Sequence, residues 1–449
     1  MKKGTLVFDI GKTNKKLFVF DEKFQVVFQE SKQFSEITDE DGFPMEDLDA
    51  IEVWIKASFQ RIVTNQNFLI EGVNFSTYGA SIVCLDHEGK RCTPFYNYLK
   101  PLPDDFQDQF MQKYGPKELF EEQTSGPYLG MLNSGLQLYF LKYYRPNFYQ
   151  KVKTVLHLPQ YLSSLIGLNY VNDYSSLGCH TGLWDYKEKK FAAWVLKEGF
   201  LELFPSISTE NFEKVNKLRI GKGIHDSTAS SLPYIKGFKD SFILISTGTW
   251  SVAMKPADLT PIKVSDIKND TVLFMSPEGT PIKATRLLMG LHYQESLKLF
   301  SEAFQISTPD IENIKYDPKF RDLRSTSKHL ILNHHLLEPE RFGFVNGTND
   351  NIDSFESVEQ IIHQLVFEIV DLQTASMRPL LVAPPKAFFI DGGFTRNQIF
   401  LKIISNKLKP TPVFKSNRPI GSAMGACLTV REIGINTKEF FELYEIEKI

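Results

Sequence analysis

The chain has 449 residues, of which 51 are Lys or Arg and 54 are Asp or Glu, so its formal net charge is -3. This balance gives no bulk electrostatic reason to expect a nucleic acid or an anionic membrane as a partner, and a hydrophobic content of 42% argues against wholesale disorder. A chain of this length is too long for one hydrophobic core, so we expect two or three domains.

The four cysteines form no C-x-x-C pair and are too sparse for a disulfide framework, which favours a reducing compartment. The apolar run before Asp9 is shorter than a secretory signal requires. No segment approaches the roughly 18 to 20 apolar residues that span a bilayer. The sequence therefore predicts a cytoplasmic protein with no membrane partner.

The first predicted element is a β-hairpin over residues 5–21. An apolar strand leads into a polar turn that contains Gly11, Thr13 and Asn14, and a second apolar strand follows. Strands that alternate with a helix then indicate a mixed sheet. These further elements are a strand over 24–30, a helix over 47–65 and a strand–turn–strand unit over 73–86.

A second hairpin over residues 242–254 repeats the plan, with Thr247-Gly248-Thr249 at its turn. The two turns lie about half the chain apart, which predicts two lobes of one architecture. Residues 221–238 hold three glycines and a proline, a composition typical of a connection between domains. We therefore predict domains over 1–236 and 237–449.

The last third of the chain is predicted to hold a β-Gly-Gly-α unit. Apolar residues at helical spacing over 358–377 precede a Pro-Pro break, the strand 387–391, the pair Gly392-Gly393 and a helix over 397–408. With the two hairpins, this unit places the chain in the α/β class.

The first turn has the chemistry of a phosphate site. Its N–H groups and the Thr13 and Asn14 side chains can donate to phosphate oxygens, while Lys15 or Lys16 adds positive charge. A carboxylate beside a triphosphate is repelled unless a divalent cation lies between them, so Asp9 there implies Mg²⁺, bound directly or through water. The alternative is an aspartate that merely caps a tight turn.

The second turn offers hydroxyl groups and a glycine that lets the backbone approach phosphate closely. Two facing hairpins of this kind could hold a triphosphate from both sides. Gly392-Gly393 could form a third wall against a base or ribose, although an ordinary strand-to-helix turn has the same sequence.

Asp226, in GIHDSTAS, is the candidate general base, because a carboxylate in reach of an acceptor hydroxyl can take its proton during phosphoryl transfer. Its position in the predicted connection would place it in a cleft between domains, the usual location of a small-molecule site. The alternative is a helix N-cap, since Asp-Ser-Thr-Ala is good capping sequence. The two roles are compatible.

The order of a D-x-G hairpin, H-D-S-T-A-S, S-T-G-T-W-S, D-G-G and a late G-S-A-M-G-A resembles the FGGY family of carbohydrate kinases over essentially the whole chain. Within that family, the segments IHDSTAS, ISTGTWS and RLLMGL are most similar to rhamnulokinases, with L-fuculokinases close behind. The combination is specific although each piece alone is weak.

The resemblance implies two actin-like domains of the ribonuclease H type with an interdomain cleft, the first domain for sugar and the second for ATP. It makes Asp226 the catalytic base and Asp9 the carboxylate associated with Mg²⁺. The remaining implied residues divide into phosphate contacts (Gly11, Thr13, Asn14, Lys15, Thr247, Gly248 and Thr249), contacts at the adenosine end (Gly392, Gly393 and Asn397, above the helix 421–426) and sugar contacts (Tyr78, Gly79, Asp173 and His225).

Two positions depart from the family pattern. Lys12 stands in the first turn where small hydroxyl residues or glycine are usual. Tyr96 is followed by Tyr98 and Lys100, where many members have an aspartate and then a basic residue. In a site that recognises hydroxyl groups, such a change can alter selectivity by orders of magnitude.

The resemblance predicts that MgATP phosphorylates a 6-deoxyketose such as L-rhamnulose or L-fuculose at O1, with a pentulose such as xylulose or ribulose as the next candidate. A competing hypothesis is a non-catalytic nucleotide switch, which would keep both hairpins without needing a carboxylate at 226. The aromatic content is compatible with a homodimer but is explained as well by two cores.

Overall fold

The computed structural model describes residues 1–321, 323, 349–418, 421–431 and 434–449. The chain divides into two compact units, which we call the first unit and the second unit. The first unit comprises residues 1–237 together with 272–282 and 420–436, and the second comprises 238–271, 283–419 and 437–449. Two short pieces of the later chain thus belong to the first unit.

The first unit is built on a seven-stranded sheet in the order β11-β12-β6-β1-β2-β3, with β13 beside β6. Strands β1 and β2 form the predicted antiparallel hairpin, and β1 runs parallel to β6. The consecutive residues Leu6, Val7 and Phe8 of β1 are completely buried, so both faces of this central strand are covered. The strands are β1 Lys2–Ile10, β2 Lys15–Asp21, β3 Val26–Lys32, β6 Phe68–Thr77, β11 Phe212–Val215, β12 Leu218–Gly221 and β13 Ile224–His225.

Helices cover the sheet of the first unit. Helices α1 and α6 pack on β6, as does α15, which also contacts β1 and α9. Asp47 caps α1 by accepting a hydrogen bond from the N–H of Ala50. These helices are α1 Leu48–Val63, α6 Leu158–Ser164, α9 Asp226–Gly237 and α15 Gly421–Val430.

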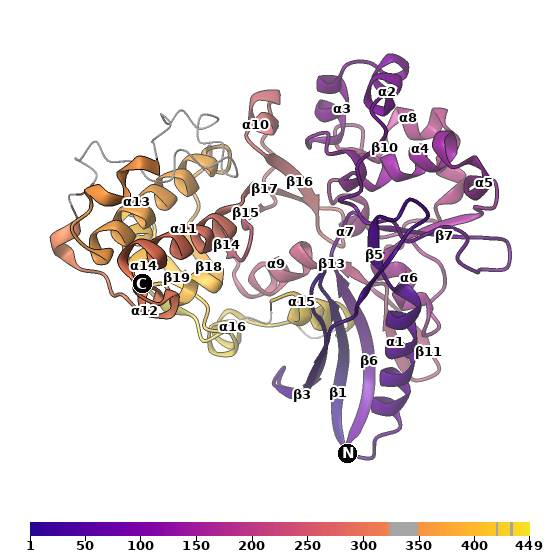
Figure 1. Cartoon of the computed structure of the whole chain (residues 1–449). Coiled ribbons are helices and arrows are strands. Elements are labelled where there is room, and N and C mark those ends of the chain that lie inside the picture. The colour runs from indigo at the N-terminus through magenta and orange to yellow at the C-terminus, as the bar shows by residue number, and fades with distance from the viewer. Residues whose placement is uncertain (322, 324–348, 419–420, 432–433) are drawn as a thin grey trace. The chain divides into compact units, whose positions relative to one another are not determined.

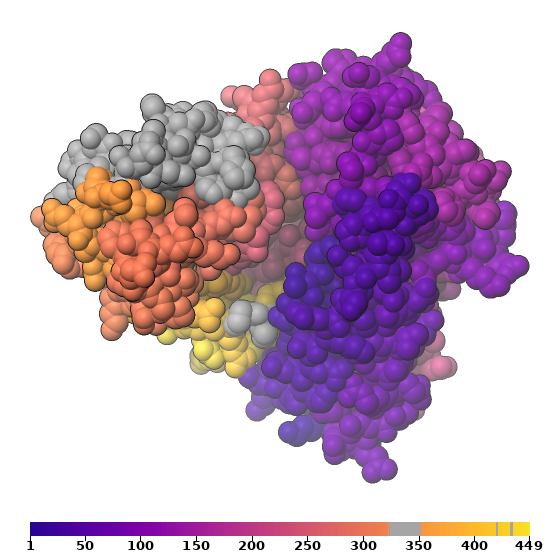
Figure 2. Space-filling view, viewed as in Figure 1, coloured from indigo at the N-terminus to yellow at the C-terminus, as the bar shows by residue number. Residues whose placement is uncertain are grey.

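A helical subdomain with an aromatic-rich core of its own completes the first unit. The arm formed by β4 and β5 lies over it, and Figure 2 shows this arm in dark indigo on the purple helices. Lys100 fixes the arm through ion pairs with Asp39 and Asp41 at 2.5 and 2.7 Å. The elements are β4 Glu36–Thr38, β5 Pro44–Glu46, β7 Ile82–Leu85, α2 Phe106–Tyr114, α3 Lys117–Thr124, η1 Gly130–Leu132, α4 Ser134–Tyr144, α5 Pro146–Tyr149, β8 Thr154–His157, α7 Tyr174–Leu177, β9 Trp184–Asp185, β10 Lys190–Phe191, α8 Ala193–Lys197 and η2 Phe200–Leu203.

The second unit repeats the arrangement around a sheet in the order β16-β17-β15-β14-β18-β19-β20. Strands β14 and β15 form the second predicted hairpin, and β14 runs parallel to β18. The unit contains β14 Phe242–Thr247, β15 Ser251–Pro256, α10 Val264–Lys268, most of β17 Pro281–Leu287, α11 Met289–Phe304, α12 Thr308–Glu312, η3 Pro318–Phe320, η6 Asn349–Ser354, α13 Val358–Ser376, η7 Arg378–Leu380, β18 Ala387–Gly392, η8 Gly393–Arg396, α14 Gln398–Lys407, β19 Val413–Lys415, α16 Thr437–Leu443 and β20 Glu447–Lys448 (Figure 1). Strand β16 Thr271–Met275, at the edge of this sheet, belongs to the first unit from residue 272 onward.

The repeat predicted from the two turns is present in the sheets. In each unit, the first strand of a hairpin pairs in parallel with a later strand that follows a helix, β6 after α1 and β18 after α13. The predicted α/β class is therefore correct. Among the described residues, none of the helices combines the length and the apolarity that a membrane crossing needs.

The structure refines one local prediction and corrects another. Residues 221–238, predicted as a connection between domains, form the end of β12, strand β13 and the 12-residue helix α9, and the main segment of the first unit ends at residue 237. The segment over 73–86 forms two strands as expected, but not a hairpin: β7 pairs with β8, while β6 pairs with β1. Glycines and turn residues marked chain reversals correctly but could not identify the strand partners.

Candidate functional site

The tip of the first hairpin is a tight turn that exposes polar side chains. The N–H of Gly11 donates to the carbonyl oxygen of Asn14 at 3.0 Å, which closes the turn. A Cβ on Gly11 would lie 3.1 Å from that same oxygen, so glycine suits the close approach. Thr13 and Asn14 are exposed beside it, as a phosphate site requires.

The ammonium group of Lys15 is not available to a ligand at the tip of the first hairpin. Its side chain is 2% exposed, its ammonium pairs with the carboxylate of Glu46, and it donates to the carbonyl oxygen of Lys12 at 2.9 Å. Alternation along β2 places Lys16 on the opposite, exposed side. The positive charge that we assigned to Lys15 or Lys16 is therefore available at Lys16, and Lys15 has a structural role.

Asp9 and Asp226 lie at the same edge of the first sheet. Asp9 pairs in register with Ser76 of β6, and His225, which precedes Asp226, pairs with Thr77. Because β1 and β13 both run parallel to β6, their carboxyl ends meet at one edge, the usual place for a ligand site in such sheets. The fold thus brings together two carboxylates that are more than 200 residues apart in sequence.

Both carboxyl groups hold protons more tightly than usual. Burial raises the pKa of Asp226 to about 6, opposed by hydrogen bonds from Ser227. Burial also raises the pKa of Asp9 to about 6, and the charge of Asp226 adds to this shift while a hydrogen bond from Ser422 opposes it. Buried carboxyl groups with raised pKa values beside one another are typical of functional sites.

His225 stands beside the candidate base. Burial lowers its pKa to about 3, so the imidazole is neutral at physiological pH. Its Nε2 lies 3.3 Å from Oδ1 of Asp226 and 2.9 Å from Sγ of Cys179. A neutral ring that carries its proton on Nε2 can donate to Asp226, whose side chain keeps 36% of its surface exposed. His225 can therefore orient the Asp226 carboxylate on one side, while the exposed part of that carboxylate remains accessible to a ligand.

Gly79 and Tyr78 form the turn next to His225. A Cβ on Gly79 would lie 2.7 Å from Sγ of Cys179 and 3.0 Å from the His225 ring, so only glycine fits without displacing them. The Tyr78 hydroxyl donates to Glu46, and its ring meets Tyr98 edge-on at 6.0 Å between centroids. The structure therefore places both predicted residues beside the acid pair, with the Tyr78 hydroxyl already engaged by the protein.

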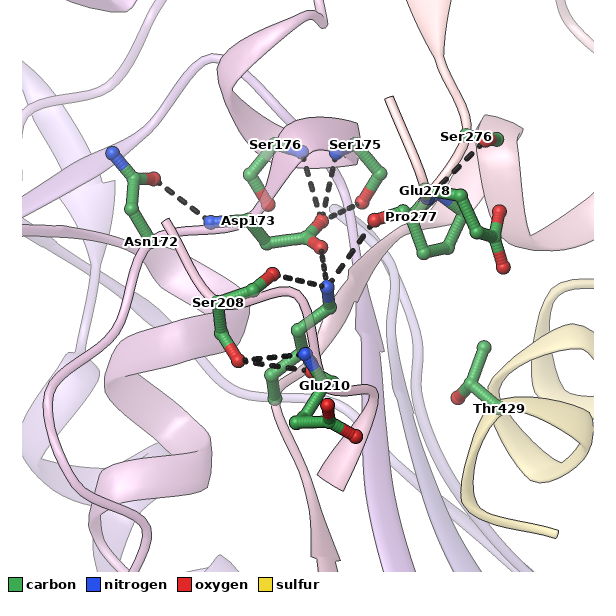
Figure 3. A network of polar contacts seen from close by, with 12 residues as sticks. Asn172, Asp173, Ser175, Ser176, Ser208, Glu210, Ser276, Pro277, Glu278 and Thr429 are labelled. Atoms are coloured by element: carbon green, nitrogen blue, oxygen red, sulfur yellow. Dashed lines mark hydrogen bonds and ion pairs between the residues drawn. The ribbon is translucent and has the colours of Figure 1, made fainter. Parts of the chain in front are cut away.

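Asp173, by contrast, is not available to a sugar. It is completely buried, and its Oδ1 accepts hydrogen bonds from the N–H groups of Ser175 and Ser176 at 2.8 and 3.3 Å (Figure 3). Its Oδ2 lies 2.9 Å from Nζ of Lys222, which also donates to the carbonyl oxygen of Pro277 at 3.3 Å. Asp173 caps α7 and belongs to a buried ion pair, so its assignment as a sugar contact is corrected.

The second unit contains a cavity of about 570 Å³ at the tip of its hairpin. Four predicted residues line it: Gly248, Thr249, Gly393 and Asn397. Asn397 also accepts a hydrogen bond from the N–H of Phe400 at 2.9 Å and donates to the Tyr293 hydroxyl at 3.0 Å, so it caps α14 and ties it to α11. A cavity of this size is suitable for a nucleotide.

Thr247 and Gly392 build the wall of this cavity and do not line it. The Thr247 hydroxyl donates to the carbonyl oxygen of Asp391 at 2.5 Å and accepts from the N–H of Phe394 at 3.0 Å. Gly392 has φ of 88°, and a Cβ there would overlap the carbonyl oxygen of Thr247. The two residues therefore join the hairpin to the β18 turn.

Sequence reasoning missed the residues that helices α11 and α12 add to the cavity. A Cβ on Gly290 would overlap the carbonyl oxygen of Gly248, so this glycine lets α11 approach the turn. The segment RLLMGL contains Gly290 and could have indicated this residue. The other lining residues that we did not predict belong to no motif that we used. The further lining residues are Gly290, Leu291, Tyr293, Gln294, Glu312, Asn313, Phe394 and Arg396.

Helix 421–426 was expected beneath the adenosine end but belongs to the first unit, as part of α15. A Cβ on Gly425 would overlap the carbonyl oxygen of Ala229, so the glycine permits close packing of α15 on α9. The Asn74 amide of β6 donates to the carbonyl oxygen of Ala426 at 2.9 Å. This packing brings Ser422 to Asp9.

The fold is that of two-domain actin-like ATPases. A carbohydrate kinase from Novosphingobium aromaticivorans aligns with a TM-score of 0.78 and 19% identity over 100% of this chain and 94% of its own. A ligand-bound xylulose kinase from Lactobacillus acidophilus aligns with a TM-score of 0.74 and 15% identity over 100% of this chain and 93% of its own. At these identities the likeness concerns the fold alone.

Residues 5–240 match the N-terminal domain of the FGGY family of carbohydrate kinases, and the chain belongs to this family. A rhamnulokinase from Halalkalibacterium halodurans is 25% identical over 267 residues, which cover 55% of each protein. The match thus spans about half the length of that relative. Family membership agrees with the resemblance found in the motifs and speaks against a non-catalytic switch.

Proposed function

We propose that this protein transfers the γ-phosphoryl group of ATP to a primary hydroxyl of a ketose, preferably O1 of a 6-deoxyketose such as L-rhamnulose or L-fuculose. The observation that carries the proposal is the pair Asp9 and Asp226, which share one sheet edge and have pKa values raised to about 6. The preference for a 6-deoxyketose is supported by the rhamnulokinase-like motifs and by the 25% identical relative.

Asp226 is assigned the role of general base. Its carboxylate is partly exposed, and a raised pKa brings it nearer to the operating pH, where a base is most effective. As the γ-phosphoryl group reaches the acceptor oxygen, the hydroxyl proton passes to Asp226. The neutral ring of His225 lies 3.3 Å from the same carboxylate and, with its proton on Nε2, can donate to it and hold it in place. Positioning provides much of the remaining rate enhancement because the transition state is loose.

The acid pair also fits a divalent cation. Two repelling carboxylates provide the oxygen ligands that Mg²⁺ prefers, and Asp9 would hold the ion directly or through water. When bound, Mg²⁺ neutralises charge on the phosphates. On the protein side, the exposed Lys16 contributes further positive potential.

The second-unit cavity is assigned to the nucleotide. Gly248 and Gly393 place backbone without a side chain on its wall, and Thr249 supplies a hydroxyl, so phosphate oxygens can approach closely. Asn397 and Tyr293 offer polar groups between two helices, where a base or ribose can be held. Each unit thus supplies one part of the reaction, the acceptor and base from the first and the nucleotide from the second.

The test is a coupled assay of ADP release against a panel of 6-deoxyketoses, pentuloses and polyols, with and without Mg²⁺. We expect a 6-deoxyketose to stimulate ADP release most strongly, and Asp226→Asn to abolish this stimulation without loss of ADP binding. Asp240→Asn, at an exposed aspartate of the second unit, is the matched control. No stimulation by any sugar or polyol would contradict the proposal, and stimulation by pentuloses alone would support the alternative substrate.

A further inference from the structure

Lys12, in the turn of the first hairpin, has a cationic side chain to which the proposed function gives no role. Its Nζ lies 5.9 Å from the centroid of the Tyr78 ring and 5.7 Å from that of the Tyr98 ring. Both distances are within the range of a cation–π contact, and the two rings meet edge-on. The ammonium of Lys12 is therefore held against Tyr78 and Tyr98, which we call the aromatic wall.

The ammonium of Lys12 has few protein partners. In the part of the chain that the structure describes, its one ion pair is with Glu36 of the arm at 3.7 Å, which is longer than a hydrogen bond. The side chain of Lys12 keeps only 25% of its surface exposed, so water solvates it incompletely. Because an ammonium carries three N–H donors, this group can still bind oxygen atoms of a ligand.

A single buried carboxylate fixes both the backbone of Lys12 and the ring against which its side chain lies. Lys15 donates to the carbonyl oxygen of Lys12 at 2.9 Å, and the same ammonium pairs with Glu46. Glu46 is buried and also accepts a hydrogen bond from the Tyr78 hydroxyl. The turn and the aromatic wall are thereby fixed to each other, so the ammonium has a defined position before any ligand binds.

The register of the first sheet places Lys12 and the candidate base on either side of Tyr78. The last residues of β1 and β13 both pair with Thr77, on opposite sides of β6. Neighbouring strands lie about 4.8 Å apart, so the ends of β1 and β13 are about 10 Å apart. Burial raises the pKa of Tyr98, and the charge of Asp226 raises it further. The aromatic wall therefore lies within electrostatic range of the candidate base.

An anionic oxygen suits the Lys12 ammonium better than a sugar hydroxyl. A largely buried cation is costly unless an anion compensates it, and Glu36, whose side chain is 49% exposed, compensates it weakly. The other two lysines of this hairpin are placed differently, since Lys15 is paired with Glu46 and Lys16 lies on the opposite side of β2. Lys12 is thus the lysine of the first hairpin that faces the aromatic wall.

We propose that Lys12 binds the phosphoryl group during its transfer to the acceptor oxygen and stays in contact with it in the phosphorylated product. The inference rests on the proposed function, since it takes phosphoryl transfer as the reaction. The bond between the γ-phosphorus and ADP breaks as the bond to the acceptor oxygen forms, and Asp226 takes the hydroxyl proton. Lys12 keeps its protons and donates hydrogen bonds to the phosphoryl oxygens, which carry the charge in the transition state.

Two substitutions at residue 12 of the full chain test the inference. Lys12→Met removes the charge but keeps a flexible apolar side chain against the aromatic wall, so we expect kcat for the best ketose of the panel to fall by about 10²- to 10³-fold. The KM for that ketose and the affinity for ADP should change little. Lys12→Arg keeps the charge and should recover most of the lost kcat. Lys23→Met, at an exposed lysine in the turn after β2, is the matched control and should retain the kcat of the parent.

A binding measurement separates this role from a structural one. In calorimetry without ATP, the phosphorylated product, purified from the reaction of the parent protein, should bind Lys12→Met about tenfold or more weakly than it binds the parent. The unphosphorylated ketose should bind both proteins alike. Equal losses of affinity for product and ketose would mean that Lys12 only supports the aromatic wall, and would overturn the inference.

The kinetic outcomes also distinguish this inference from the proposed function. An unchanged kcat in Lys12→Met, or a change confined to the KM for the ketose, would overturn the role of Lys12 and leave the kinase reaction intact. If no ketose stimulates ADP release by the parent protein, the proposed function itself fails, and the role of Lys12 fails with it.

Discussion

The two hairpins have the same topology but different chemistry at their tips. Strand β1 pairs with β2 and with the parallel strand β6, just as β14 pairs with β15 and with the parallel strand β18. The first hairpin carries Asp9 and ends beside Asp226, both with raised pKa values. The second presents Gly248 and Thr249 to a cavity. A repeated backbone arrangement therefore supports an ionisable hairpin site in one unit and an uncharged hairpin tip in the other.

This difference separates the two requirements of phosphoryl transfer. A base must change its protonation state, and burial next to another carboxylate tunes that change in the first unit. A phosphate site needs close backbone approach, which glycines allow in the second unit. We therefore expect mutations in the first hairpin region to affect turnover, and mutations in the second to affect nucleotide binding.

The sharpest test of this separation is Asp226→Asn. Loss of a general base lowers kcat by about 10²- to 10⁴-fold. The affinity for ADP, measured by calorimetry, should change less than twofold because the cavity residues belong to the second unit. Equal losses in turnover and in ADP affinity would mean that the two roles are not separate.

A second test concerns the buried charges behind the acid pair. Lys222→Met leaves Asp173 as an uncompensated buried carboxylate, so we expect a loss of about 3–5 kcal/mol in the free energy of unfolding. The double variant Lys222→Met with Asp173→Asn should recover part of this loss, as measured by urea denaturation. A double variant no more stable than the single one would argue against charge as the cause.

In the second unit, two glycines of the same cavity should behave differently. Gly290→Ala forces a Cβ into the carbonyl oxygen of Gly248, whereas the nearest atom to a Cβ on Gly248 is 3.7 Å away. We expect Gly290→Ala to lower the melting temperature by several degrees and to weaken ADP binding. Gly248→Ala should leave the melting temperature unchanged, and similar melting temperatures for the two variants would contradict this reading.

The smallest expected effect is the pH dependence of stability. The carboxyl of Asp226 has a folded pKa of about 6 against an ordinary value of 3.8, so between these pH values the folded state binds more protons than the unfolded state. The free energy of unfolding should therefore fall as pH rises through this window. Relative to the parent, Asp226→Asn should gain melting temperature from pH 4 to pH 7, and a constant difference would contradict the raised pKa.

The same ionisation predicts the activity profile. As a base, Asp226 must be unprotonated, so kcat/KM should rise with pH and level off above about 6. Initial rates of ADP release with saturating MgATP and limiting ketose measure this directly. A profile that is flat from pH 5 to pH 8 would exclude Asp226 as the titrating base.

Local patterns predicted the elements well where the periodicity was strong. Both hairpins, α1, α13 and α14 lie within a few residues of their expected bounds. Asp9 was found because it lies near the end of a strand that leads into a turn, and Asp226 because it begins a helix in a capping sequence. These features depend on neighbouring residues only, and the sequence displays them directly.

The missed features depend on residues far apart in the chain. Alternation alone could not tell whether Lys15 or Lys16 faces Glu46, since the partner lies on a separate arm. Asp173 looked like a ligand because Lys222, which pairs with it, is distant in sequence. Gln294 and Glu312 line the second-unit cavity from two helices that carry no recognisable spacing.

Two segments of the later chain belong to the first unit, so no single cut of the chain separates the two units completely. A fragment that ended at residue 237 would lack Ser422, the partner of Asp9, and Pro277, the carbonyl partner of Lys222. Its strand β6 would also lose the helix held by Asn74. Cleavage of the chain at this point would therefore leave both fragments incomplete. Replacement of one fragment by that of a related protein would have to preserve the contacts that residues of both fragments make.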